Sequence, residues 1–314
     1  EMKHKLIMEN WRRFVEEVEG EEQVEDGGEL SKQLLALSVP DFVNRLNQNN
    51  REDMEALLMG LKDGSMDDDK IKIVPANVPV VQLKPTQNEV VWDKSIPFAL
   101  ERPKVFMEYY SSDGPFEVGP PGNDAIITLN GEYIMDGHHR WSSLYCVNPR
   151  ASIATFDIQI KSVGPLEMLR LIQASILSAK QEIPSAKGGG TNLFGIPQEE
   201  IKGEVLKILT PELANQYVAL GFLEGDGGDG GTDAAAEDGR SQKRTQAVAK
   251  KLIGIYKRNI KIMQSASKPV SGANKRDSMP QTDKVGDVAA GGAIPAGLAP
   301  LTKGVIDHEP PFKK

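Results

Sequence analysis

Two adjacent histidines followed by an arginine are the residues of this chain best suited to chemistry on an anion. His138, His139 and Arg140 come directly after Asp136-Gly137, and we call residues 136–140 the DGHHR box. A guanidinium can bind two oxygens of a phosphate or carboxylate at once, and an imidazole can donate a proton or a hydrogen bond near neutral pH. The carboxylate of Asp136 could orient one imidazole or carry a cation. The box therefore indicates phosphate or phosphoester chemistry.

The pattern around the box predicts a strand, a glycine turn and a helix. Residues 125–129 are apolar and precede Asn130-Gly131, a dipeptide typical of type I′ hairpins because both central residues need positive φ. Residues 133–135 then predict the returning strand, and residues 138–145 carry apolar side chains at helical spacing. Unpaired N–H groups and the positive dipole end at the start of such a helix favour an anion. The alternative is a capped helix whose arginine pairs with a carboxylate and whose histidines are half-buried packing residues.

The stretch from Gly131 to Arg140, with the sequence GEYIMDGHHR, resembles the signature of the ParB/sulfiredoxin superfamily, in particular its ParB-like nuclease branch. The resemblance covers residues 73–162. It implies a small α+β domain in which the box ends a strand, opens a helix and holds nucleotide phosphates. Members include CTP-hydrolysing partition proteins, sulfiredoxins, small-molecule serine kinases and proteins described as nucleases. The resemblance therefore implies a nucleotide or phosphoester ligand and leaves the reaction open.

The same resemblance suggests roles for residues outside the box. Thr86 falls in the turn where the superfamily has its first box, and Lys94 and Ser95 could touch a phosphate at the start of the next helix, although Lys94 could instead be an ordinary surface lysine. Glu89 could act as the general base that takes a proton from a substrate hydroxyl, although a glutamate in a polar turn is usually exposed. The candidate catalytic residues are Glu89, His138 and His139. The candidate phosphate-binding or nucleotide-binding residues are Thr86, Lys94, Ser95, Asp136, Gly137, His138, His139 and Arg140.

Metal and thiol chemistry have less support in the sequence. Neighbouring side chains on a helix diverge by about 100°, so His138 and His139 are poorly placed to share one ion. A Mg²⁺ ion that arrives with a nucleotide and uses Asp136 is compatible with the pattern, since phosphate sites often use a metal with few protein ligands. Sulfiredoxins carry a cysteine directly before the His-Arg pair, where this chain has His138. We therefore expect Cys146 to be a buried, inert thiol.

Composition limits the classes of protein to which the chain could belong. Its 314 residues allow two domains of ordinary size, and 39% hydrophobic residues support one modest core. The net charge of −8 argues against a protein that coats nucleic acid over its whole surface. One cysteine excludes an internal disulfide framework and fits a reducing compartment. Because no apolar run approaches about 18 residues and no signal peptide is recognisable, we expect a cytoplasmic protein without a membrane span.

The N-terminal segment is expected to be separate from the box. Residues 1–28 comprise an amphipathic helix at 4–19 and an acidic linker, so this helix could dock on a protein partner or fold back on its own chain. The segment from Lys5 to Phe14, with the sequence KLIMENWRRF, also resembles the opening of marine tailed-phage proteins. That resemblance implies a phage-encoded protein of the host cytoplasm or the virion. Residues 29–70 are predicted to form a helical flank.

The central region changes to short β-branched runs and then back to helices. The ParB/sulfiredoxin-like domain is expected at residues 71–162, with a strand at 153–160 and three or four strands in one sheet. Residues 163–222 predict a helical extension with a break at Thr210-Pro211, where Thr210 can cap the next helix. We expect these helices to flank the sheet.

The C-terminal region changes sign of charge. Residues 223–239 are rich in glycine and aspartate and predict a flexible linker. Residues 240–276 contain eleven Lys or Arg and no Asp or Glu, and apolar residues recur at helical spacing within 240–264. This basic helix could bind nucleic acid, an anionic surface or an acidic protein, or pack on the acidic surface of its own chain. Residues 265–314 are expected to be disordered.

Two functions from different classes follow from the sequence. The first is a ParB-like nuclease-family protein that binds a nucleotide or phosphoester at Asp136–Arg140, with activity as a nuclease, NTPase or small-molecule kinase left open. The second is a phage virion or assembly protein that uses the fold for protein interaction and has an inactive pocket. Both predict an α+β protein with a small mixed sheet, flanking helices and a disordered C-terminal tail.

Overall fold

The computed structural model divides the chain into two compact units. We call residues 73–159 and 185–281 the sheet unit; the other unit comprises residues 1–72, 160–184 and 282–314. The predicted docking helix at 4–19 lies outside the described residues. The structure describes residues 33–48, 71–118, 125–160, 163–180, 187–223, 234–281, 298 and 301.

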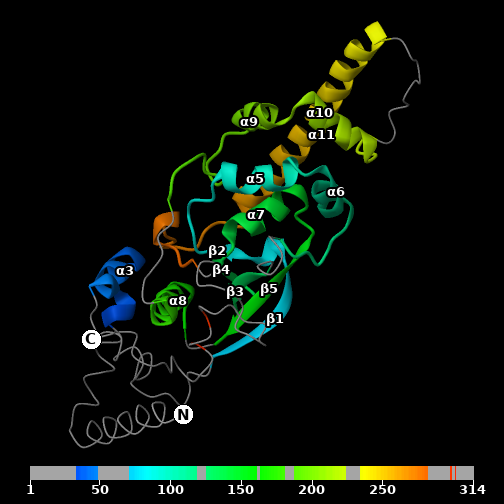
Figure 1. Ribbon diagram of the computed structural model, residues 1–314. Coiled ribbons are helices and arrows are strands. Elements are labelled where there is room, and N and C mark those ends of the chain that lie inside the picture. Colours follow the sequence, from blue (N-terminus) through cyan, green and yellow to red (C-terminus); the bar gives the residue numbers. More distant parts are fainter. Residues whose placement is uncertain are drawn as a thin grey trace, which may run out of the picture. The chain divides into compact units, whose positions relative to one another are not determined.

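The sheet unit contains a mixed five-stranded sheet with the strand order β1-β5-β3-β4-β2 (Figure 1). Strand β3 runs parallel to β5 and antiparallel to β4, and β2 pairs in parallel with β4. This mixed sheet with flanking helices confirms the predicted α+β fold class. The expectation of three or four strands missed β2, which has only two residues. The strands are β1 (Lys72–Pro79), β2 (Lys84–Pro85), β3 (Ile126–Leu129), β4 (Tyr133–Asp136) and β5 (Ser152–Gln159).

The hairpin that leads into the DGHHR box turns at Asn130 and Gly131, as predicted. Their φ angles are +52° and +64°, the positive values that a type I′ turn requires. Strand β5 also holds this turn, because Oδ1 of Asp157 accepts hydrogen bonds from the N–H of Gly131 at 2.7 Å and from the hydroxyl of Thr128 at 2.9 Å. The hairpin thereby fixes the direction of β4, whose last residue is the first residue of the box.

Helix α7, which begins with the two histidines, is the central helix of the sheet unit. It packs against β3, α5, α6, α11 and the short 3₁₀ helix η1. Eight of its ten residues are buried, and the indole N–H of Trp141 donates to the carbonyl of Val80 at 2.9 Å. A helix enclosed on several sides lacks a strongly polar face. The helical elements of the sheet unit are η1 (Val80–Gln82), α5 (Trp92–Leu100), α6 (Pro103–Ser111), α7 (His138–Val147), α9 (Glu200–Ile208), α10 (Pro211–Ala219), α11 (Ala234–Ala266) and η2 (Arg276–Ser278).

Helices α9 and α10 are divided at Thr210-Pro211, as predicted. The hydroxyl of Thr210 accepts a hydrogen bond from the N–H of Leu213 at 3.2 Å and caps α10. We expected these helices to flank the sheet. Instead α9 packs mainly on α11, and α10 packs mainly on α11 and α6, because their apolar faces are matched by the long apolar face of α11.

The basic helix α11 packs on its own chain. The sequence leaves open whether residues 240–264 bind a partner or pack on their own chain. The apolar face of the helix packs on its own chain. The amide of Asn259, which is fully buried, donates to the carbonyls of Cys146 and Val147 at the end of α7 at 3.0 and 2.8 Å. The helix begins at Ala234, so residues 234–239 are helical rather than part of a linker. Its buried apolar residues are Val248, Ala249, Leu252, Ile255, Tyr256, Ile260 and Met263.

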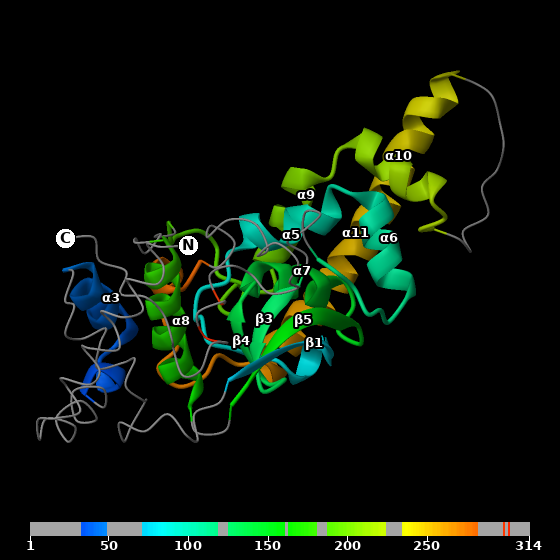
Figure 2. The same cartoon turned by 60° about the horizontal axis from the view of Figure 1, so that its bottom comes forward.

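Residues 265–314 were expected to be disordered, but residues 267–281, the described segment after α11, return to the sheet; most of the later residues lie outside the described ones. The N–H of Val270 donates to the carbonyl of Pro85 at 2.9 Å, next to strand β2. Asn274 forms an isolated parallel bridge with Gln87. Backbone pairing of this kind needs no apolar periodicity, so the composition of the segment did not predict it. Figure 2 shows this orange segment from a second direction.

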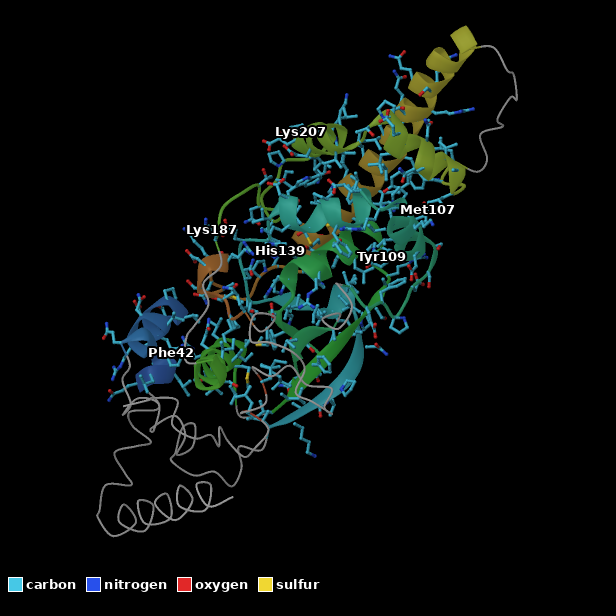
Figure 3. All side chains as sticks on the ribbon, viewed as in Figure 1. Phe42, Met107, Tyr109, His139, Lys187 and Lys207 are labelled. Atoms are coloured by element: carbon cyan, nitrogen blue, oxygen red, sulfur yellow. The ribbon has the colours of Figure 1, made fainter. Side chains whose placement is uncertain are left out.

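The second unit contains α3 (Val39–Asn47) and α8 (Pro165–Lys180), which pack on each other. The hydroxyl of Ser38 accepts from the N–H of Asp41 at 3.2 Å and caps α3. Phe42 is fully buried in this unit (labelled in Figure 3). Among the residues that the structure describes, every helix is too short or too polar to cross a membrane.

Candidate functional site

The DGHHR box starts with a turn that only glycine can make. Gly137 has φ of +91°, and a Cβ atom on it would lie 2.4 Å from Cγ2 of Ile126 on β3. Its N–H donates to Oδ1 of Asp136 at 2.6 Å, and its carbonyl accepts the first helical hydrogen bond of α7 from Trp141. The predicted order of strand, glycine turn and helix is therefore confirmed. The turn places the start of α7 directly after the end of β4.

His138 joins this helix to strand β2. Its Nε2 accepts a hydrogen bond from the N–H of Thr86 at 3.1 Å, and the hydroxyl of Thr86 donates to the carbonyl of Ile134 at 2.5 Å. An imidazole nitrogen that accepts an N–H is unprotonated, so the proton of the neutral ring is assigned to Nδ1. Burial, followed by the neighbouring His139, lowers the pKa of His138 to about 3. His138 is thus a buried, neutral link between two segments.

His139 makes the equivalent link to helix α5. Its Nε2 accepts a hydrogen bond from the N–H of Val91, the N-cap residue of α5, at 3.1 Å (His139 is labelled in Figure 3). Burial, followed by the positive charges of Arg276 and Lys94, lowers the pKa of His139 to about 3. Both imidazoles are therefore neutral at physiological pH. Neither can act as an imidazolium acid there, but each can donate a hydrogen bond from Nδ1.

Lys94 and Arg276 bring positive charge to this junction. Lys94 is exposed in the first turn of α5, and Arg276 is half-buried and donates from Nη1 to the carbonyl of Lys187. Sequence reasoning missed Arg276 because it belongs to residues that were expected to be disordered. The signal that could have identified it is the absence of acidic residues from the stretch 240–276.

Arg140 lies over the glycine turn and is half-buried. Its Nη1 donates to the carbonyl of Ala125 at 3.1 Å, and its Nη2 is 3.2 Å from the position that a Cβ on Gly137 would occupy. Part of the donor capacity of the guanidinium is therefore spent on the backbone before β3. Nη2 lies at the same glycine turn that precedes the start of α7.

Ser95 lies inside the helix pair rather than on its surface. It is fully buried, and its hydroxyl donates to the carbonyl of Val91 at 3.0 Å. The hydroxyl of Ser142 on α7 lies 2.7 Å from that of Ser95 and 3.1 Å from the carbonyl of His139. The geometry gives Ser95 the role of a tie between α5 and α7, while Lys94 beside it remains exposed.

Glu89 holds a glycine-rich loop. Its Oε1 accepts a hydrogen bond from the N–H of Gly189 at 2.9 Å, and Oε2 lies 3.1 Å from the position of a Cβ on Gly188. Gly190 has φ of +122°, and a Cβ there would lie 2.4 Å from Cγ1 of Val91. The triple glycine thus allows the loop to approach the start of α5. This geometry gives Glu89 an anchoring role.

Two distant segments hold the loop that carries Thr86 and Val91. On one side, Asn192 accepts from the N–H of Val90 at 3.1 Å and donates to the carbonyl of Asn88 at 2.8 Å. On the other side, the N–H of Asn274 donates to the carbonyl of Thr86 at 3.2 Å. The backbone N–H groups that meet the two imidazoles are therefore fixed from both sides.

Metal ligands do not gather in the part of the chain that the structure describes. No group of three or more His, Cys, Asp and Glu side chains that could hold an ion is found among those residues. Asp136 is half-buried at the end of β4 and is the single carboxylate of the box. Cys146 is buried, as predicted, and burial raises the pKa of its thiol.

No protein-family model, curated protein or solved structure matches the chain. The chemistry of the site must therefore be inferred from its own geometry.

Proposed function

We propose that the protein binds a nucleotide or another phosphoester where the first turns of α5 and α7 meet, as the resemblance to the ParB/sulfiredoxin superfamily implies. The observation that carries this proposal is the hydrogen bond between Val91 and His139, which joins the two helix N-termini at 3.1 Å. In α5 the N–H groups of Val91 and Trp92 are already used by His139 and by the carbonyl of Thr191, but the N-terminus of a helix still carries about half a positive charge. Two such ends side by side favour an anion between them.

The side chains around this junction support the same ligand. Lys94 and Arg276 act on His139 as positive charges, and Arg140 lies beside the glycine turn. Lysine and arginine at helix N-termini are the usual partners of phosphate oxygens. Because both imidazoles are neutral, they would stabilise a phosphate as hydrogen-bond donors. Asp136 would hold Mg²⁺ if the metal arrives with a nucleotide, and that ion would neutralise phosphate charge.

The test is the change in melting temperature of the full chain with nucleoside mono-, di- and triphosphates and inorganic phosphate, each with and without Mg²⁺. At least one of these ligands should raise the melting temperature. Arg140→Ala should abolish the shift. Lys94→Gln with Arg276→Gln should reduce it by at least half, whereas the control pair Lys104→Gln with Lys202→Gln, two exposed lysines of α6 and α9, should retain it.

Two results would contradict this proposal. One is the absence of any shift for the unsubstituted protein across the whole panel. The other is an equal shift for the site pair and the control pair of variants. Nuclease action would require metal-dependent cutting that is lost in His139→Ala.

A second function is favoured by a specific observation. Every candidate catalytic side chain already has a structural partner: Thr86 for His138, Val91 for His139 and the glycine loop for Glu89. Such a site suits a phage assembly protein with an inactive pocket. This function predicts no nucleotide shift and a changed assembly state when residues 1–20 are removed, as measured by light scattering. Removal of 240–264 is not a useful test, because α11 forms part of the core.

A further inference from the structure

The surface of α11 that faces away from the core carries a row of lysines. Lys243, Lys250 and Lys257 are seven residues apart and Lys261 follows; at 3.6 residues per turn, the four lie within about 40° of one another around the helix. Lys243, Lys250 and Lys261 are exposed, and Lys257 is half-buried. At about 1.5 Å per residue the row is about 27 Å long. We call these four residues the lysine row. Helix α11 is the long yellow-to-orange helix in Figures 1 and 2.

The lysine row has no structural use in the described part of the chain. Ion pairs there include those of Lys84, Arg150 and Lys207, and none involves a lysine of the row. Lys251 on the same helix is different, because its ammonium donates to the carbonyl of Phe222 and lies 4.5 Å from the centre of the Phe222 ring. Lys251 thus stabilises the fold, whereas four like charges along one line repel one another.

The composition of this surface favours a polyanion over a protein partner. Protein interfaces have an apolar centre and are depleted in lysine. The large apolar side chains that are exposed among the described residues are Val81, Leu206 and Leu220, none of which is on α11. An acidic protein would therefore find charge but no apolar anchor beside the row.

The same surface favours double-stranded over single-stranded nucleic acid. Single strands are commonly bound by aromatic side chains on which bases stack. The one aromatic residue of α11, Tyr256, is fully buried. A duplex presents phosphates at regular spacing without exposed base faces, and about 27 Å corresponds to about eight base pairs at 3.4 Å each.

A glycine in the middle of the row is a second observation. Gly254 is exposed between Lys250 and Lys257, and a Cβ on it would meet no atom within 4 Å. Glycine lowers helix stability, and neither packing nor a positive φ requires it here. Because Gly254 has no side chain, the phosphate backbone of a duplex can approach the helix backbone closely between Lys250 and Lys257.

We propose that the lysine row binds the phosphate backbone of a nucleic-acid duplex, without sequence specificity. The row contains none of the residues placed at the α5–α7 junction, so this proposal is independent of the proposed nucleotide site and is tested separately. Salt should weaken this binding strongly, because each neutralised phosphate releases counterions.

The test is fluorescence anisotropy of a labelled DNA duplex of about 20 base pairs, titrated with the full chain at several NaCl concentrations. Four phosphate contacts predict a slope of about −3.6 in a plot of log K against log salt concentration. Replacement of all four row lysines with Gln should bring the slope close to zero and weaken binding by at least tenfold at low salt. The control variant has the same net charge as the row variant, because it replaces four exposed lysines elsewhere with Gln: Lys72, Lys104, Lys202 and Lys207.

Further arms distinguish the alternatives. Gly254→Leu, which leaves charge unchanged, should weaken duplex binding without lowering the melting temperature. An RNA duplex should bind with a similar slope, since the contact is with phosphates. Tighter binding of single-stranded DNA or of poly-glutamate than of the duplex would overturn the proposal, as would equal loss of binding in the row and control variants.

Discussion

Replacing Gly137 with alanine tests how the glycine turn positions the site. The residue has φ of +91°, a conformation that costs an L-residue about 1–2 kcal/mol. The new Cβ would also lie 2.4 Å from Cγ2 and 2.8 Å from Cβ of Ile126, and forcing such an atom into a packed core costs about 1–3 kcal/mol. The free energy of unfolding should therefore fall by about 2–5 kcal/mol in Gly137→Ala.

The matched control is Gly131→Ala in the β3–β4 hairpin. Gly131 also has a positive φ, +64°, but a Cβ on it would meet nothing within 4 Å. This variant should lose only the conformational part, about 1–2 kcal/mol. Urea unfolding followed by circular dichroism measures both losses, and the difference between the two variants isolates the contact with Ile126.

A double-mutant cycle with Ile126→Ala completes this experiment. Ile126→Ala removes Cγ2, the atom that approaches the new side chain, so the loss in the double variant should be about 1–2 kcal/mol smaller than the sum of the single losses. In the binding assay, Gly137→Ala should also reduce any nucleotide-induced shift, because it displaces the start of α7. The reasoning is refuted if Gly137→Ala and Gly131→Ala are equally stable, or if the two sites show no coupling.

Three further predictions concern stability. His138 and His139 have pKa values of about 3 in the folded protein and about 6.5 in the unfolded chain. As the pH falls, the unfolded state therefore binds protons first, and the folded state loses stability. The free energy of unfolding should be at its full value above about pH 6.5 and should decrease by about 1.4 kcal/mol per histidine for each pH unit below that, down to about pH 3. Urea unfolding at pH 7.5 and 5.5 measures this decrease. If the variant with both His138→Gln and His139→Gln keeps the full pH dependence, the dependence belongs to other groups. Asn259→Ala should lose about 2–4 kcal/mol, because two carbonyls at the end of α7 lose their donor; a loss below about 0.5 kcal/mol would contradict that role. Gly254→Ala should instead raise the free energy of unfolding by about 0.5–1 kcal/mol, and with it the melting temperature. A destabilised variant would show that the glycine is structurally required.

Features that depend on one residue type in one backbone conformation were predicted correctly from the sequence. Asn130 and Gly131 form the turn because few other pairs tolerate two positive φ angles. Thr210 caps α10 because its hydroxyl can reach the N–H three residues on. Such preferences act within a few residues, so the surrounding fold does not need to be known.

Features that join distant segments were not predicted. Arg276, whose positive charge acts on His139, lies in a segment without apolar periodicity, and β2 is too short to leave a pattern. The basic stretch within 240–264 predicted a helix, but whether its apolar face would meet a partner or its own chain depended on the matching faces of α7, α9 and α10. Charge and periodicity describe a face of a helix, not what covers it.

The sequence by itself determined that a strand, a glycine turn and a helix would place His138, His139 and Arg140 at a helix N-terminus, because positive φ and helix starts are set locally. Only the tertiary structure decided which polar atoms of that site are engaged. Both Nε2 atoms accept hydrogen bonds from backbone N–H groups of Thr86 and Val91, 52 and 48 residues away in the chain. Hydrogen bonds between segments so far apart depend on how the elements pack, and packing leaves no local trace in the order of residues.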